Sequence, residues 1–203
     1  MNLNARSRSI TMSSHIKSSV FSRRRALIAA TSSVLSAGTI ALLGGGRIAH
    51  ANTASESDIA ILNVAVGLEY EGIAAYAIAL KSGLLDEATA KVAAKFQDDH
   101  KRHNDALIAA IRQLGGEPVT TKAEAEYAEA LNVDQLEHQT DVLDLAARLE
   151  LGATNAYLGV IPSFSDSALA KVAARLAADE ASHFAVLNLS LGRPFAPALG
   201  FGA

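Results

Sequence analysis

Apolar residues recur every three or four positions along four long segments of the chain, from residue 57 onward. This spacing is the period of one face of an α-helix, and the alternation typical of β-strands is nearly absent. The segments end at turn signals that include Ser82-Gly83, Gly115-Gly116 and Gly192. The pattern predicts helices over residues 57–81, 86–114, 133–160 and 167–191, with a short helical piece over 122–131.

The inward-facing positions of these segments form a ladder that occurs twice. The first segment carries Leu62, Val66, Glu69, Ile73, Tyr76 and Leu80, and the third repeats this ladder at a constant offset as Leu143, Ala147, Glu150, Thr154, Tyr157 and Ile161. The second segment carries Phe96, His100, His103, Leu107 and Ala110, and the fourth repeats it at an offset shorter by one position as Leu176, Glu180, His183, Leu187 and Ser190. Such seams suit a left-handed bundle. We therefore expect an all-α four-helix bundle of two duplicated hairpins, joined by a long crossover link over residues 115–132.

Each of the four seams is interrupted at the same level by residues that carry charge or an imidazole. These residues are Glu69, His100, His103, Glu150, Glu180 and His183. A lone buried carboxylate would cost several kcal/mol or stay protonated. Four helices that aim such groups at one layer make physical sense if a cation lies between them, and a pair of metal ions would satisfy all of them.

Taken separately, these signals are weak. Glu180 and His183 lie three residues apart, as do His100 and His103, and helices supply such pairs by chance on their solvated faces. A bundle that keeps an inherited polar layer, held by water and hydrogen bonds, is the alternative interpretation. The coincidence of six residues in one layer of a duplicated seam favours a metal site.

The pattern resembles the ferritin-like superfamily, the di-metal carboxylate bundles that include ferritins and rubrerythrins. That family places a Glu on helices one and three and Glu-x-x-His on helices two and four, all pointing inward. The resemblance covers the chain from Ser57 to Leu191. It implies that Glu69 and Glu150 are the single glutamates, and that His103 and the Glu180–His183 pair belong to the two motifs.

His100 departs from the family pattern because it stands where the second helix would carry glutamate. The site would then hold three carboxylates and three imidazoles, which compensates an oxidised di-iron pair less well and suits divalent ions. Asp99, on the flank of the seam, is an alternative source of the fourth carboxylate.

We expect a divalent metal cofactor, with iron first and manganese or zinc as alternatives. Tyr76 and Tyr157 are expected in the core, where they could donate hydrogen bonds, and Glu71 on the surface or behind the site.

The first 51 residues hold seven Lys or Arg residues and no acidic residue. Ser22-Arg23-Arg24-Arg25-Ala26-Leu27 resembles a twin-arginine export signal, and Ala49-His50-Ala51 fits a cleavage site before Asn52. We interpret residues 1–51 as a cleaved signal peptide and 52–203 as the mature domain, periplasmic or otherwise exported, with the twin-arginine machinery as partner. An uncleaved membrane anchor is the alternative, although the Ser, Thr and Gly of the apolar run make it a poor span.

Removal of the leader would leave 11 basic against 21 acidic residues, a net charge near −10 on 152 residues. An acidic body without a basic stripe argues against nucleic acid and anionic membrane surfaces as partners. The chain has no cysteine, so disulfides and thiolate metal sites are excluded.

The expected function is that of an exported metal-binding bundle, either an oxidoreductase that acts on peroxide or dioxygen or a metal-handling protein in oxidative stress. The alternative is a non-catalytic stress-protective or structural bundle with a degenerate site. Metal storage ranks lower because nothing in the sequence marks cage contacts. Smaller homo-oligomers are compatible with the sequence.

Overall fold

The computed structural model describes residues 51–194, which belong to one compact unit, and their side chains from residue 55 onward. These residues form helices and no strand. The elements in order are α2 (Ala51–Lys81), α3 (Glu87–Gln113), α4 (Glu124–Ala130), η1 (Val133–Gln135), α5 (Gln139–Val160), η2 (Ile161–Ser163) and α6 (Ser167–Ser190). The predicted all-α bundle is confirmed.

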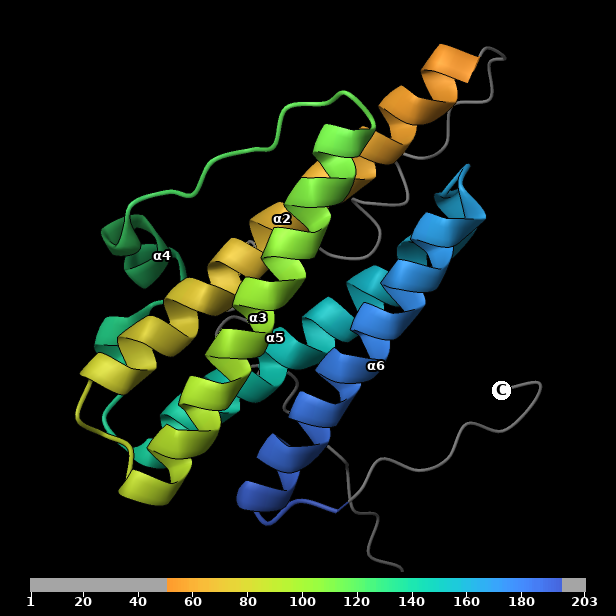
Figure 1. The fold of residues 1–203 in the computed structure, drawn as a ribbon. Helices are drawn as coiled ribbons and strands as arrows, with labels where there is room; N and C mark the ends of the chain where they lie inside the picture. Colours follow the sequence, from red (N-terminus) through yellow and green to blue (C-terminus); the bar gives the residue numbers. More distant parts are fainter. Residues whose placement is uncertain (1–50, 195–203) are drawn as a thin grey trace, which may run out of the picture. The chain divides into compact units, whose positions relative to one another are not determined.

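Two antiparallel helical hairpins make up the bundle. Helix α2 packs along α3 and α5 packs along α6, and the hairpins meet chiefly through α2 and α5. The link after α3 runs back along the outside of the first hairpin and places the short helix α4 beside α2 (Figure 1). Lys81 at the end of α2 forms an ion pair with Glu124 at the start of α4, with 2.6 Å between Nζ and Oε2.

Local signals account for most of the helix ends. The Asp86 side chain accepts a hydrogen bond from the Thr89 backbone N–H at 2.7 Å, which caps the start of α3. Gly115 and Gly192 follow α3 and α6 with φ values of 80° and 67°, the left-handed conformation in which a helix commonly ends. The predicted bounds of these two helices hold to within one residue.

Two helix starts differ from the prediction. Helix α2 begins at Ala51 rather than at residue 57. The third long helix begins at Gln139 rather than at residue 133. The chain turns at Asn132, which has a φ of 52°, passes through the 3-10 turn η1, and restarts after His138, whose backbone N–H donates to Asp141. Apolar residues in that turn extend the helical pattern without extending the helix.

The apolar core lies in two clusters, one on each side of the polar layer. One contains Ile61, Leu62 and Leu107, and the other contains Phe96 and Leu143. Residues Ser55–Lys81 of α2 are long and apolar enough, with a mean hydropathy of 1.3, to cross a membrane by length and composition. This helix nevertheless packs along α3 and buries charged residues, as the core helix of a bundle does.

Asp58 is a buried charge that the sequence pattern did not single out. It lies in the first described turns of α2 with 2% of its surface exposed. Its carboxylate accepts hydrogen bonds from the backbone N–H groups of Ser165 and Asp166 at 2.8 and 3.1 Å. Asp58 therefore ties the start of the first hairpin to the turn of the second.

Candidate metal centre

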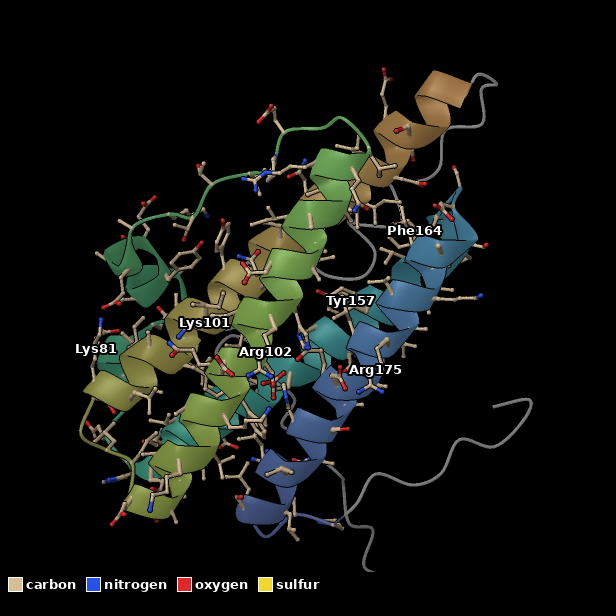
Figure 2. All side chains as sticks on the ribbon, in the orientation of Figure 1. Lys81, Lys101, Arg102, Tyr157, Phe164 and Arg175 are labelled. Carbon is tan, nitrogen blue, oxygen red and sulfur yellow. The ribbon has the colours of Figure 1, made fainter. Side chains whose placement is uncertain are left out.

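The structure brings all six predicted residues into one buried cluster midway along the bundle. Glu69 comes from α2, His100 and His103 from α3, Glu150 from α5, and Glu180 and His183 from α6. None is more than 8% exposed. Residues three apart share one face of a helix, so each of α3 and α6 presents two side chains to the centre. Tyr157, labelled in Figure 2, lies on α5 about two turns after Glu150.

The six residues form two overlapping groups of potential ligands. One group is Glu69, His100, His103 and Glu180, and the other is His100, Glu150, Glu180 and His183; within each group, one N or O atom per residue lies within 4.8 Å of the others. The duplication relates the two groups, because Glu150 repeats Glu69 and His183 repeats His103. His100 and Glu180, which are also related by the repeat, belong to both groups. The arrangement suits two neighbouring cations, each with its own carboxylate and imidazole.

The imidazole nitrogens face the carboxylate oxygens at short range. His100 lies across the centre, with Nδ1 2.7 Å from Glu69 Oε2 and Nε2 3.4 Å from Glu150 Oε1. His103 Nδ1 lies 3.0 Å from Glu180 Oε1, and His183 Nδ1 lies 3.3 Å from Glu180 Oε2. The last two contacts have the distance of an ion pair without the directed geometry of a hydrogen bond.

Several atoms of the cluster remain without a hydrogen-bond partner among the residues that the structure describes. They are His103 Nδ1, His183 Nδ1, Glu150 Oε2 and both carboxylate oxygens of Glu180. Leaving buried polar atoms unpaired costs free energy, and these atoms all belong to the two ligand groups. Carboxylates with imidazoles are a donor set that binds divalent transition metals. The residues present therefore fit a metal centre of two divalent ions.

In the metal-free protein, protons on the imidazoles supply the positive charge. Burial alone would lower the pKa of His103, but the nearby carboxylates of Glu180 and Glu69 raise it to about 9. Glu150 and Glu180 act on His183 in the same way and raise its pKa to about 9. The pKa of His100 also rises well above its ordinary value, because Glu150 and Glu69 outweigh its burial.

The pKa values of the three carboxylates in the cluster shift in different directions. Burial works to raise the pKa of Glu69 and Glu150, but hydrogen bonds and charges from the imidazoles outweigh it and lower both pKa values. Burial dominates at Glu180, whose pKa is raised. A metal that enters the centre must therefore displace protons from the imidazoles, and its affinity depends on pH.

Two tyrosines cross between the hairpins to hold the single glutamates. The Tyr76 hydroxyl on α2 donates to Glu150 on α5, and the Tyr157 hydroxyl on α5 donates to Glu69 on α2. Burial, followed by the adjacent carboxylate, raises the pKa of each phenol well above its ordinary value, so both remain donors. The tyrosines are core residues, as expected, and they also orient carboxylates of the cluster. The exchange of partners shows that the two hairpins are related by a pseudo-two-fold axis.

A second repeated pair lies on the outer side of the imidazoles. Asp99 Oδ2 lies 3.4 Å from His183 Nε2, and Asp179 Oδ2 lies 3.7 Å from His103 Nε2. Asp99 is in turn paired with Lys95, and Asp179 with Arg175 at 2.9 Å. Arg175, labelled in Figure 2, lies on α6 one turn before Asp179. Such outer carboxylates fix the orientation of a ligating imidazole.

The position of Asp99 differs from that of a fourth carboxylate ligand, the alternative that the sequence offered for it. It contacts the outer nitrogen of His183 and is in neither ligand group, whereas His100 is in both. Asp179 was not predicted at all. The signal was present in the sequence, because Lys95 and Asp99 recur at the offset of the repeat as Arg175 and Asp179.

The comparisons with known proteins agree with this architecture. The family described as ferritin-like domain matches residues 57–193, which include all six cluster residues. The crystal structure of a conserved hypothetical protein from Mycobacterium tuberculosis is similar, with a TM-score of 0.60, 23% identity, and coverage of 72% of this chain and 99% of that chain. That likeness concerns the fold. No curated protein matches the chain. Because the family match spans two thirds of the sequence, the chain belongs to the ferritin-like domain family.

Proposed function

We propose that this protein is exported and binds a pair of divalent metal ions, iron in the first place, in the core of its bundle. The observation that carries the proposal is the pair of overlapping ligand groups, which share His100 and Glu180 and leave buried nitrogen and oxygen atoms unpaired within the described residues. The export of the protein rests on the sequence of residues 1–51, of which residues 1–50 lie outside the described part of the chain.

Glu69 and His103 would hold one ion and Glu150 and His183 the other. Glu180 has two carboxylate oxygens and would serve both sites, whereas the neutral ring of His100 has one free nitrogen and would serve one of them. The chain keeps these side chains in place before any ion arrives. Tyr76 and Tyr157 hold Glu150 and Glu69 by hydrogen bonds. Asp179 and Asp99 restrain the imidazoles of His103 and His183 from the outer side. Apolar clusters pack against the layer on either side.

A bound divalent transition metal would supply a redox-active centre for reaction with peroxide or dioxygen. The protein would accordingly act as an oxidoreductase or as a metal-handling protein in oxidative stress. With three carboxylates, the chain compensates the divalent state of the ions better than the trivalent state. Ferrous iron, manganese and zinc are therefore the ions to test first.

A non-catalytic bundle that never holds a metal is the second candidate, and one observation favours it. His100 already spans the centre and contacts both Glu69 and Glu150, so a proton on its ring substitutes for part of a cation's charge. This function would make the bundle structural or stress-protective.

Metal analysis of the purified protein separates the two candidates. We expect close to two ions per chain in the wild type and a loss of most of them in Glu150→Ala and His183→Ala. Asp105→Ala is the matched control, because Asp105 is exposed on α3 only two residues from His103. Equal and negligible metal in the wild type, both variants and the control would refute the metal-binding proposal. If metal is present, turnover of hydrogen peroxide by loaded and metal-stripped protein tests the oxidoreductase role.

A further inference from the structure

A cavity of about 600 Å³ lies inside the bundle between α2, α3 and α5, toward the end of α2. Most of its wall is apolar, with Ile78, Leu85 and Leu149 among the lining side chains. Its inner end reaches His100 and Glu150 of the metal centre. The cavity is therefore continuous with the centre, and a molecule inside it would lie against the proposed ligands.

The repeated half of the bundle provides an internal reference for this cavity. The corresponding end of the second hairpin, around Tyr157 and Leu169, holds a cavity of only about 10 Å³. Because the two halves share their helix register, the difference comes from side chains and connections. The fold itself does not require a hollow there.

Larger residues fill the second half at positions where the first half is small. Ala79, Gly83 and Thr89 of the first hairpin correspond in the repeat to Val160, Phe164 and Leu169. Val160 and Leu169 belong to the buried core and Phe164, labelled in Figure 2, packs against it. A Cβ built at Gly83 meets nothing within 4 Å. The first half thus lacks the side chains that close its counterpart.

The link between the hairpins forms the outer wall of the cavity. Ala128 of α4, Val133 of η1 and Leu136 line it, and the ion pair of Lys81 with Glu124 lies at its rim. The second hairpin has no equivalent cover among the described residues, since α6 is followed directly by the end of the described chain. One side of the cavity is accordingly covered by the link between the hairpins, which has no counterpart in the second half among the described residues.

The charges around the cavity limit what it can bind. Lys81 is neutralised by Glu124, and His100 by its carboxylate partners, which leaves Glu71 as the remaining ionisable carboxyl on the wall. The rest of the wall is largely apolar. No cationic group among the described lining residues is left over for an anionic headgroup, so an uncharged ligand matches the wall best.

We propose that this cavity binds a neutral, mostly apolar organic molecule, with one end against His100 and Glu150. A space of this size takes a ligand of roughly 15 to 20 non-hydrogen atoms. Binding requires no metal. Such a molecule would be the substrate or reductant of the metal centre, and this part of the proposal rests on the proposed function.

The test is binding of the neutral fluorescent probe N-phenyl-1-naphthylamine to metal-stripped full-length protein. We expect one probe per chain in the wild type. Affinity should fall at least about tenfold in the double variant Ala79→Val/Thr89→Leu, which carries the residues of the filled half. Ala109→Val makes one of these two kinds of change, Ala to Val, at an exposed position of α3 and should bind as the wild type does. Absence of binding to the wild type, or equal binding to the filled variant, would overturn the proposal.

Competition with 1-decanol and decanoate, which have equal chain lengths, tests the charge argument. The alcohol should displace the probe at lower concentration than the anion, and the reverse order would refute a neutral ligand. Circular dichroism and metal content of the filled variant should match the wild type, which shows that filling leaves the fold and the centre intact. Probe binding without metal binding would refute the proposed function and leave the cavity proposal standing. Metal binding without probe binding would refute the cavity proposal and leave the proposed function standing.

Discussion

The metal-free protein should lose stability as pH rises through the pKa values of its core imidazoles. His103 and His183 have an ordinary pKa of 6.5 and a folded-state pKa of about 9, because nearby carboxylates outweigh their burial. The folded state therefore binds protons more tightly than the unfolded chain. The resulting stabilisation is fully present below about pH 6.5 and is lost as pH approaches and passes about 9.

The magnitude follows from the size of the shift. At about 1.4 kcal/mol per pKa unit, each imidazole contributes roughly 3 kcal/mol to the free energy of unfolding at low pH. The two contributions do not simply add, because both rings face the same Glu180 carboxylate. We therefore expect the free energy of unfolding to fall by at least about 3 kcal/mol between about pH 6.5 and about pH 9.5.

The measurement is urea unfolding of chelator-treated protein, followed by far-UV circular dichroism at a series of pH values. His103→Gln should flatten part of the decline, whereas His138→Gln, at an exposed position before α5, should leave the slope as in the wild type. Saturating divalent metal should reverse the trend, because ions compete with protons for the same nitrogens and bind more tightly as pH rises. A flat profile, or a metal-free protein that gains stability with pH, would refute this account of the cluster.

Two further predictions concern the surroundings of the centre and the leader. Asp179→Asn removes the carboxylate 3.7 Å from His103 Nε2 and should weaken metal binding about tenfold in a chelator competition, while Asp98→Asn, whose partner is the exposed Arg102, should change nothing. Replacement of Arg23 and Arg24 by Lys should strand the precursor in the cytoplasm, as measured by immunoblotting of cell fractions; continued export would count against the export of a folded, metal-loaded protein.

The fold was predictable because it depends on a strong periodic signal that occurs twice. A ladder of steps of three and four, present once in each hairpin, specifies which helix faces turn inward. Once those faces are known, helix geometry places the two residues of each motif on one inward face, and the repeat gives both hairpins the same order of residues along their ladders. The convergence of six residues was accordingly accessible from the sequence.

The features that the sequence did not reveal depend on contacts between elements. The turn at Asn132 delays α5 although the apolar pattern continues through it, because a left-handed residue leaves no mark on hydrophobic periodicity. Asp58 looks like any polar residue near a helix start until the turn before α6 is seen to donate to it. The cavity has no signature of its own, since small residues such as Ala79 occur throughout the helices.

Two differences between the halves of this bundle lie next to each other. His100 replaces the carboxylate that Glu180 provides in the repeat, and the cavity replaces packed core on the same side of the centre. Gly72 joins the two differences, because a Cβ at this position would lie 2.9 Å from Cε1 of His100, and Gly72 also lines the cavity. Its counterpart in the repeat is Ala153, so the missing methyl group makes room for the imidazole. His100, together with Glu150, therefore lies against both the proposed ions and the proposed ligand.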